Sequence, residues 1–347
     1  MLSLERRRFL ALAGASLPAL LTAGCPSPGK GGRNSGGLRA GLVTDTAGVD
    51  DGSFNAGAWE GLTRAAKDFG FETKLIESRR NADYVPNLVR FGEAGFDVVF
   101  AVGFLLQQAV EEAARRFPKT RFALVDGEAA DLPNMVAYRF REEEGAFLAG
   151  ALAALTSKTH VLGFVGGLEV PLIRKFECGY AAGARTAVPG TVVKVGYANS
   201  FDDPTKGSEI ALLQMSAGAD VLFHASGRTG LGVIKAVAGK GEGRFAIGVD
   251  RDQDDVAPGR VLTSMLKRVD VAVHAVCRQV KEGSFKPGTI EQGLAEGALA
   301  LSPMRFTKDL LPKGAMERVD AYRARIVSRE IVVPKTLDQL AAYKPKG

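Results

Sequence analysis

The chain is poor in the residues on which catalysis and covalent cross-linking most often depend. Its 347 residues include three histidines and three cysteines. Three cysteines are too few for a small disulfide-stabilised scaffold, which needs several pairs. The sequence also lacks a G-x-S-x-G elbow, an H-E-x-x-H zinc motif and a Walker A loop. These absences favour a binding protein over an enzyme, and they give no reason to expect a metal or a cofactor.

Long runs of one kind of residue are missing as well. The net charge is +6 at pH 7, but the lysines and arginines are scattered. Nucleic-acid-binding proteins gather their basic residues into a patch or stripe, so we exclude nucleic acid as a partner. The apolar segment near the N-terminus, residues 9–21, is shorter than the roughly 20 residues that a membrane-spanning helix needs.

The N-terminal segment instead has the layout of an export signal. Three arginines are followed by the apolar segment and then by small residues before Cys25. Residues 5–10 (ERRRFL) resemble a twin-arginine signal, and residues 22–25 (TAGC) resemble the lipobox of bacterial lipoproteins. We therefore predict a signal peptide over 1–24, a lipid on Cys25, and a flexible Gly-, Ser- and Pro-rich tether over 25–37. The alternative is an ordinary cleaved signal that leaves Cys25 unmodified.

Beyond the tether, strand-like and helical segments alternate along the chain. Short apolar runs predict strands, and longer runs with a 3.6-residue period predict helices. The predicted strands are 39–44, 71–76, 97–101, 121–125, 161–165, 191–197, 221–225, 244–249 and 261–265. The predicted helices are 55–69 (with Ser53 as N-cap), 84–94, 107–117, 142–155, 173–186, 206–217 and 232–238. Repeated βα units imply parallel sheets covered on both faces, and the pattern restarts near residues 156–160, which predicts two α/β lobes, 38–157 and 158–267.

Ligands of open α/β lobes bind beyond the carboxyl ends of the strands. The residues that follow the predicted strands are therefore candidates for a shared cleft between the lobes. They include Asp45, Gly103, Phe104, Asp126, Gly166, Gly167, Phe201, Asp202, Ser226, Gly227, Asp250 and Lys267.

Several strings in this chain resemble those of one protein family. They are residues 43–55 (VTDTAGVDDGSFN) with 59–61 (WEG), 122–127 (FALVDG), 166–176 (GGLEVPLIRKF), 248–253 (GVDRDQ) and 263–270 (TSMLKRVD). In this order they resemble the basic membrane protein family, whose best-described members are purine nucleoside receptors of nucleoside ABC transporters.

The resemblance implies a type I periplasmic-binding fold, with two parallel-sheet lobes joined by a three-strand hinge. The chain would return to the first lobe at about residues 268–285 and to the second lobe at about residues 288–347. It also implies a monomeric, extracytoplasmic, lipid-anchored substrate-binding protein that serves an ABC transporter permease and has no catalytic residues.

Carried over residue by residue, the resemblance implies a ligand site for adenosine, guanosine or inosine. Phe54 and Phe201 would sandwich the purine. Asp45, Asn55 and Asp126 would meet the polar edges of the base or shape that wall, and Gly227, Asp250 and Lys267 would hold the ribose. Independent chemistry agrees, since a flat base needs aromatic faces and a ribose diol needs an acceptor of two hydroxyl hydrogens. The alternatives are another small ligand, such as a sugar or a signal molecule, and a nucleoside-processing enzyme.

A few side chains have two interpretations. Cys277 lies on an apolar helical stripe, so we expect Cys178 and Cys277 to be buried thiols, with a disulfide between them as the alternative. Arg228 stands where the family often has small residues, and it either points to solvent or reaches the ligand. His224 lies in an apolar strand, where a packed or hydrogen-bonded ring is commoner than a catalytic base.

Overall fold

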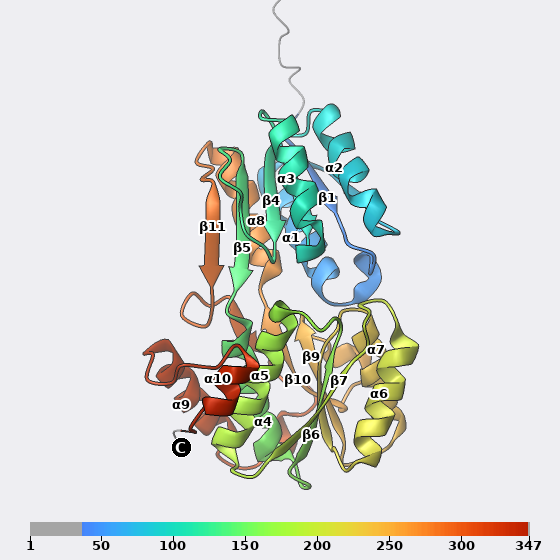
Figure 1. Cartoon of the computed structure of the whole chain (residues 1–347), viewed down its shortest axis with the longest axis vertical. Helices are drawn as coiled ribbons and strands as arrows, with labels where there is room; N and C mark the ends of the chain where they lie inside the picture. Colours follow the sequence, from blue (N-terminus) through green and yellow to red (C-terminus); the bar gives the residue numbers. More distant parts are fainter. Residues whose placement is uncertain (1–36, 346–347) are drawn as a thin grey trace, which may run out of the picture. The chain divides into compact units, whose positions relative to one another are not determined.

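Two six-stranded sheets organise the protein. Its structure is a computed structural model that describes residues 37–345, so the predicted signal peptide, Cys25 and nearly all of the tether lie outside the described residues. The strand orders are β11-β5-β4-β3-β1-β2 and β12-β10-β9-β8-β6-β7, and Figure 1 shows both sheets with their covering helices. Two α/β lobes with parallel sheets were predicted, and this fold class is confirmed.

The first lobe is a wholly parallel sheet with helices on both faces. Its strands are β1 (Arg39–Val43), β2 (Glu72–Ile76), β3 (Val98–Val102), β4 (Arg121–Val125), β5 (Met135–Phe140) and β11 (Gly288–Gln292). Helices α1 (Phe54–Phe69) and α8 (Val269–Glu282) pack together, as do α2 (Tyr84–Glu93) and α3 (Gln107–Arg116). Alternate residues of β3 enter two different hydrophobic cores, because successive side chains of a strand point to opposite faces. This explains the continuous apolar run of that strand.

The second lobe repeats the plan with one antiparallel edge. Its strands are β6 (Val161–Gly166), β7 (Val192–Tyr197), β8 (Val221–Ala225), β9 (Phe245–Asp250), β10 (Val261–Lys267) and β12 (Leu299–Leu301), the last antiparallel to β10. Its helices are α4 (Glu142–Thr156), α5 (Pro171–Ala187), α6 (Pro204–Ser216), α7 (Thr229–Gly239), α9 (Ala315–Val327) and α10 (Leu337–Ala342). Five short 3-10 helices lie in the loops of the described chain: η1 (Val49–Asp51), η2 (Asn81–Asp83), η3 (Phe104–Leu106), η4 (Asp254–Val256) and η5 (Lys308–Leu310).

Helices α4 and α5 approach each other unusually closely. A Cβ on Gly183 would lie 1.9 Å from the carbonyl oxygen of Phe147, and one on Gly150 would lie 2.0 Å from that of Tyr180. Only glycine permits such an approach of two backbones. Helix α4 also packs on α9, β10 and β12, so it is surrounded by apolar partners, as its Ala- and Leu-rich sequence requires.

The chain crosses between the sheets three times, after β5, after β10 and after β11. The structure differs from the predicted lobe limits at two of these places. Helix α4 packs with the second lobe, which therefore begins near residue 142 and not at 158. Strand β11 at residues 288–292 completes the first sheet, although these residues were predicted to lie in the second lobe. Sequence periodicity identifies a helix or strand but does not say which sheet it joins.

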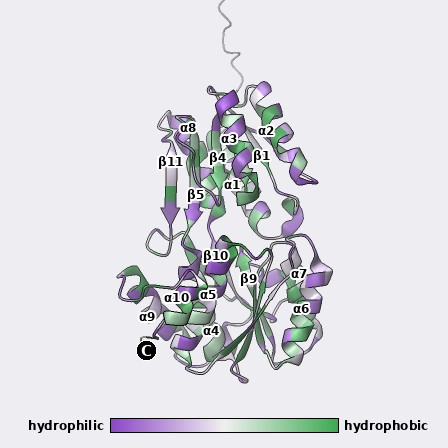
Figure 2. Cartoon of the chain, viewed as in Figure 1, coloured by the Kyte–Doolittle hydropathy of each residue, from purple (hydrophilic) through white to green (hydrophobic). Residues whose placement is uncertain are grey.

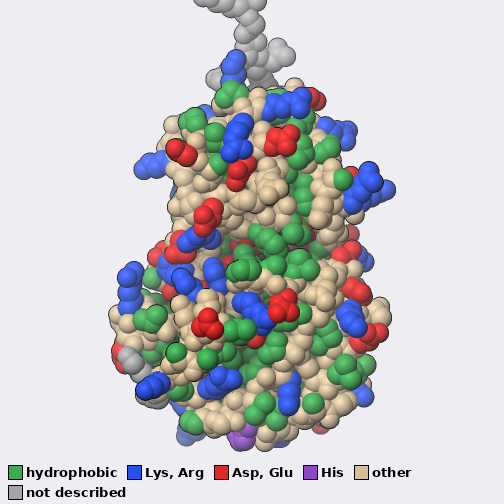
Figure 3. Space-filling view, in the orientation of Figure 1, with side chains coloured by type: hydrophobic (Ala, Val, Ile, Leu, Met, Phe, Trp, Pro, Cys, Tyr) green, Lys and Arg blue, Asp and Glu red, His purple; other side chains and the backbone are tan. Residues whose placement is uncertain are grey.

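Apolar residues concentrate in the strands and on the inner helix faces (Figure 2). On the face drawn in Figure 3, acidic and basic side chains are interspersed over both lobes. Cys178 and Cys277 are both buried free thiols, which confirms the preferred prediction. Between residues 37 and 345, we find no helix with the length and apolar character needed to cross a membrane.

Candidate ligand-binding cleft

A cavity with about 530 Å³ of empty space lies between the carboxyl ends of the two sheets. The first lobe lines it with Asp45, Ala47, Asp51, Phe54, Asn55, Gly103, Phe104 and Asp126. The second lobe lines it with Leu172, Ile173, Phe176, Phe201, Ala225, Ser226, Gly227, Val249, Asp250 and Lys267. All eight residues predicted for the site are among them.

Aromatic rings reach the cavity from both lobes. Phe54 is the first residue of α1, and Phe201 lies in the loop after β7. Phe104 follows β3, and its ring centroid is 6.3 Å from that of Phe201, edge to face. Phe176 lies on α5 and was absent from the predicted site. A residue in the middle of a helix gives no sign in the sequence that it faces a neighbouring lobe.

The first-lobe wall is held by a compact network around Asn55. Its Nδ2 donates to Asp45 Oδ1 (2.9 Å) and to Asp51 Oδ2 (3.2 Å). Asp45 Oδ1 also accepts the backbone N–H of Ala47 at 3.0 Å. These bonds orient the amide so that Oδ1 of Asn55 is left as an acceptor with no partner among the described residues. A buried acceptor without a donor is costly, and a bound molecule could supply the donor.

Asp51 supplies the cap of α1 that was predicted for Ser53. Its carboxylate accepts the backbone N–H groups of Ser53 (2.9 Å), Asn55 (2.8 Å) and Ala56 (3.0 Å), which are among the orphan donors of a helix start. Burial raises the pKa of Asp51 to about 6. Ser53 occupies the N-cap position but makes no capping bond. Its hydroxyl instead donates to Asp250 Oδ2 of the other lobe at 2.5 Å.

Two aspartates face the cavity from equivalent places in the two lobes. Asp126 follows β4 and Asp250 ends β9, with φ angles of 65° and 66°. Non-glycine residues seldom adopt positive φ, and such strain gathers at functional sites. Burial raises the pKa of each carboxyl to about 6, although Lys267 pulls both values down.

Lys267 is the buried cation at the centre of the site. It ends β10, and its Nζ lies 2.5 Å from Asp126 Oδ2 and 3.0 Å from Glu142 Oε1. Burial alone would lower the pKa of Lys267, but Asp126, Glu142 and Asp250 outweigh it and raise the pKa. The same Nζ lies 5.1 Å from the ring centroid of Phe54, a cation–π distance. The side chain therefore remains charged despite being 3% exposed.

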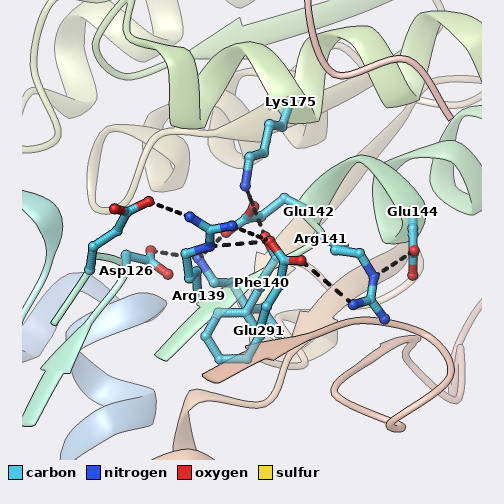
Figure 4. A network of polar contacts seen from close by, with 10 residues as sticks. Asp126, Arg139, Phe140, Arg141, Glu142, Glu144, Lys175 and Glu291 are labelled. Carbon is cyan, nitrogen blue, oxygen red and sulfur yellow. Dashed lines mark hydrogen bonds and ion pairs between the residues drawn. The ribbon is translucent and has the colours of Figure 1, made fainter. Parts of the chain in front are cut away.

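Glu142 connects this cation to the hinge and was not predicted. It begins α4 just after the first crossover, is fully buried, and its Oε2 accepts from Lys175 Nζ at 3.0 Å. Burial opposes ionisation of Glu142, but Lys267 and Lys175 outweigh it and lower its pKa. Figure 4 shows Lys175 pointing at Glu142. Two ion pairs lie beside them, one between Arg139 and Glu291 and one between Arg141 and Glu144. In the sequence, Glu142 is indistinguishable from the two glutamates that follow it.

The loop after β8 completes the second-lobe wall. Gly227 has φ 54°, and Ser226 Oγ is buried without a partner within residues 37–345. Arg228 is not among the residues that line the cavity, and it pairs with Asp202 at 2.9 Å, where both side chains are exposed. This favours the interpretation in which Arg228 points to solvent. Within the described range, no cluster of His, Cys, Asp and Glu is arranged to hold a metal ion.

Comparison with known proteins places this geometry in a family. A family model described as "ABC transporter substrate-binding protein PnrA-like" matches residues 39–337. The "CD4+ T-cell-stimulating antigen" of Listeria monocytogenes is 39% identical over 316 residues, covering 85% of this chain and 87% of that protein. The "ABC transporter nucleoside-binding protein BmpA" of Lactococcus lactis is 32% identical over 353 residues, covering 95% and 99%.

A solved structure agrees. The ABC transporter solute-binding protein of Aeropyrum pernix superimposes with a TM-score of 0.79 at 29% identity, covering 88% of this chain and 96% of that one. This likeness supports the predicted periplasmic-binding fold, and the matched family consists of binding proteins of transporters, not of enzymes. The chain therefore belongs to the basic membrane protein family of PnrA-like ABC transporter substrate-binding proteins.

Proposed function

We propose that the protein captures a purine nucleoside in the interlobe cavity and delivers it to an ABC transporter permease. One observation carries the proposal: aromatic rings from both lobes and charged side chains that can bind hydroxyl groups line the same small cavity. Phe54 and Phe201 offer flat apolar faces, and Asp250 with Lys267 offers an acceptor and a donor. The relative from Lactococcus lactis is named a nucleoside-binding protein, which supports the same ligand class.

The base belongs on the aromatic side of the cavity. Stacking on a side-chain ring contributes about 1–3 kcal/mol per base and is insensitive to the identity of the base. The free Oδ1 of Asn55 accepts a hydrogen from the edge of the base. Adenosine has a donor in its 6-amino group, and guanosine and inosine have one at N1–H, so all three satisfy this acceptor.

The ribose belongs beside the buried charges. The Asp250 carboxylate accepts hydroxyl hydrogens, since an ionised carboxylate is acceptor-only. Ser53 already donates to one of its oxygens, and the ribose hydroxyls supply the remaining donors. Lys267 donates to a ribose oxygen while Asp126 and Glu142 balance its charge.

The test is mass spectrometry of the small molecule that co-purifies with the full chain. A purine nucleoside in stoichiometric amount supports the proposal. A sugar or a peptide-like molecule that binds with the same stoichiometry, together with no calorimetric binding of adenosine, guanosine or inosine, contradicts it.

We further propose that the domain is exported and held at the membrane by a lipid on Cys25. The proposal depends on the resemblance of residues 5–10 and 22–25 to export and lipobox signals. Cys25→Ser should move the protein from the membrane fraction to the soluble extracytoplasmic fraction. Unchanged membrane association of this variant would contradict lipidation.

A further inference from the structure

The two lobes also touch outside the cavity, through the loop that follows β9. Gln253 Nε2 donates to the carbonyl oxygen of Gly52 at 3.1 Å, and Arg251 Nη2 lies 2.9 Å from Glu60 Oε2. The first bond reaches the turn just before α1 and the second reaches α1 itself, so both join the second lobe to the first. Gln253 is 2% exposed and is not part of the cavity lining. Its interlobe bond is therefore separate from ligand contact.

Three hydrogen bonds within the second lobe fix the orientation of Gln253. Its Oε1 accepts the backbone N–H of Val249 at 2.9 Å and pairs with His224 Nε2 at 3.0 Å. Its backbone N–H donates to Ser264 Oγ at 3.0 Å. An amide oxygen has two lone pairs, so Oε1 is saturated and the amide nitrogen must point across to Gly52. The second lobe thus aims one donor at the first.

His224 is matched to this role. It is fully buried on β8, and burial lowers its pKa to about 4, so the ring is neutral near pH 7. Its Nδ1 has no partner in the described part of the chain, so the ring proton belongs on Nε2, where Gln253 accepts it. A Cβ on Gly230 would lie 1.9 Å from Nδ1 of His224, which shows how closely the imidazole ring is packed.

Gly52 lies in the turn that positions the first-lobe wall. Its φ is 63°, and the neighbouring residues Asp51, Phe54 and Asn55 line the cavity. At the other end of the bond, Gln253 holds the backbone N–H of Val249, next to Asp250. The bond between Gln253 and Gly52 therefore ties together the two segments that carry the predicted base and ribose contacts.

We propose that Gln253 is a positioning residue for ligand capture: oriented by His224, it latches onto Gly52 when the lobes close and slows ligand escape. As far as ligand escape is concerned, the inference rests on the proposed nucleoside function. A contact formed only in the closed state shifts the open–closed equilibrium by its own free energy.

The sharpest variant is Gln253→Glu. The new side chain keeps an oxygen to accept from Val249 and His224, but places a carboxylate oxygen against the Gly52 carbonyl where the donor was. A matched control is Gln214→Glu. Gln214 is also buried in the second lobe, and its Nε2 donates to the carbonyl oxygen of Phe164 at 2.8 Å, within one lobe.

The first readout is nucleoside release by stopped-flow. We expect Gln253→Glu to raise the guanosine dissociation rate about tenfold, the equivalent of one lost hydrogen bond with added repulsion. Gln214→Glu should lower the melting temperature and leave the dissociation rate within about twofold of the unmodified protein. Equal release rates in the two variants would overturn the latch.

The second readout needs no ligand. Glu60→Cys with Arg251→Cys places two thiols where the interlobe ion pair now lies, and a short bis-maleimide, which reacts with one thiol at each end, cross-links the closed form. Cys178 and Cys277 are buried, and peptide mapping identifies the 60–251 product. The rate of this cross-linking should fall several-fold when Gln253→Glu is added and stay constant when Gln214→Glu is added.

The two failures are distinguishable. If no purine nucleoside binds the unmodified protein, the proposed function is wrong. The rate of cross-linking between residues 60 and 251 is then the test of the latch. If nucleosides bind but Gln253→Glu captures and releases like the unmodified protein, the latch is wrong and the proposed function stands.

Discussion

The two walls of the cleft are built on different plans. In the first lobe, Asp45, Asp51 and Asn55 bond mainly to one another and to the backbone of their own turn. In the second lobe, Asp250 and Lys267 bond across the cleft, to Ser53 and Asp126, and Lys267 also pairs with Glu142 of its own lobe. The first wall is therefore preformed, while the second is completed only when the lobes meet.

This difference indicates an order of binding. A ligand that lands on the first lobe meets an ordered surface and loses little free energy in arranging it. Closure then supplies the second-lobe contacts together, which is how hinge proteins couple capture to motion. Substitutions in the second wall should accordingly weaken closure and ligand retention, whereas those in the first wall should weaken initial docking.

The largest expected effect breaks the charge balance between the walls. Lys267→Met removes the cation that Asp126 and Glu142 share, and leaves two buried carboxylates without it. Breaking a buried ion pair from one side costs about 3–5 kcal/mol, and urea unfolding should show a loss of that size. A loss below about 1 kcal/mol would mean that the buried cluster is not needed by the fold.

The next-largest expected effect distinguishes recognition of the ribose from recognition of the base. Asp250→Ala should weaken guanosine binding by about 100-fold, because the ligand hydroxyls lose their acceptor in a buried site. The same variant should bind free adenine nearly as well as the unmodified protein does, which calorimetry can compare directly.

Asp255→Ala is the control for Asp250→Ala. Asp255 lies in the second lobe outside the cavity lining and is exposed in its pair with Arg305, so its removal should leave both affinities unchanged. Equal losses for guanosine and adenine in Asp250→Ala would contradict the assignment of Asp250 to the ribose.

Removing the Phe54 ring should have a smaller effect on nucleoside affinity, and one that is similar for all three nucleosides. Phe54→Ala should cost about 1–3 kcal/mol of binding for adenosine, guanosine and inosine alike, since stacking does not distinguish their edges. Phe306→Ala, at an exposed phenylalanine of the same chain, should cost nothing. A loss confined to one nucleoside in calorimetric titrations would show that Phe54 reads an edge and not a face.

The smallest effect is a pH dependence of affinity. Burial raises the pKa of Asp250 to about 6, and a ligand that donates hydroxyl hydrogens requires the ionised form. Affinity should therefore be full above pH 7 and fall by up to about tenfold between pH 6 and pH 5. Asp250→Asn should flatten this slope, although Asp51 and Asp126, whose pKa values are also raised to about 6, titrate in the same range. A steeper loss at high pH would reverse the sign and contradict the assignment.

The sequence predicted the parts of this site that depend on strand ends. Asp45, Asp126 and Asp250 follow apolar strands, and parallel strands bring their carboxyl ends to one edge, so their meeting could be expected. Phe176 and Glu142 could not be predicted, because their positions depend on how helices α4 and α5 pack between the lobes. The same lack of tertiary information placed α4 in the wrong lobe.

Capping chemistry shows a subtler limit. Ser53 has the right residue type and position for an N-cap, yet Asp51 takes the backbone donors and frees the serine hydroxyl for Asp250. Gln253 is a similar case, since its role depends on a bond to the other lobe. Local patterns identify candidates for these bonds, and only the packed structure shows which candidate makes them.

The central claim is that one purine nucleoside binds between the two walls, and calorimetric titration of the full chain with guanosine, adenosine, inosine and adenine tests it most directly. We predict one-to-one binding of all three nucleosides, and binding of adenine that is weaker by about 100-fold, because adenine supplies no hydroxyl hydrogens to the buried Asp250 carboxylate. The absence of binding by every nucleoside, or equal affinity for adenine and adenosine, would contradict the account.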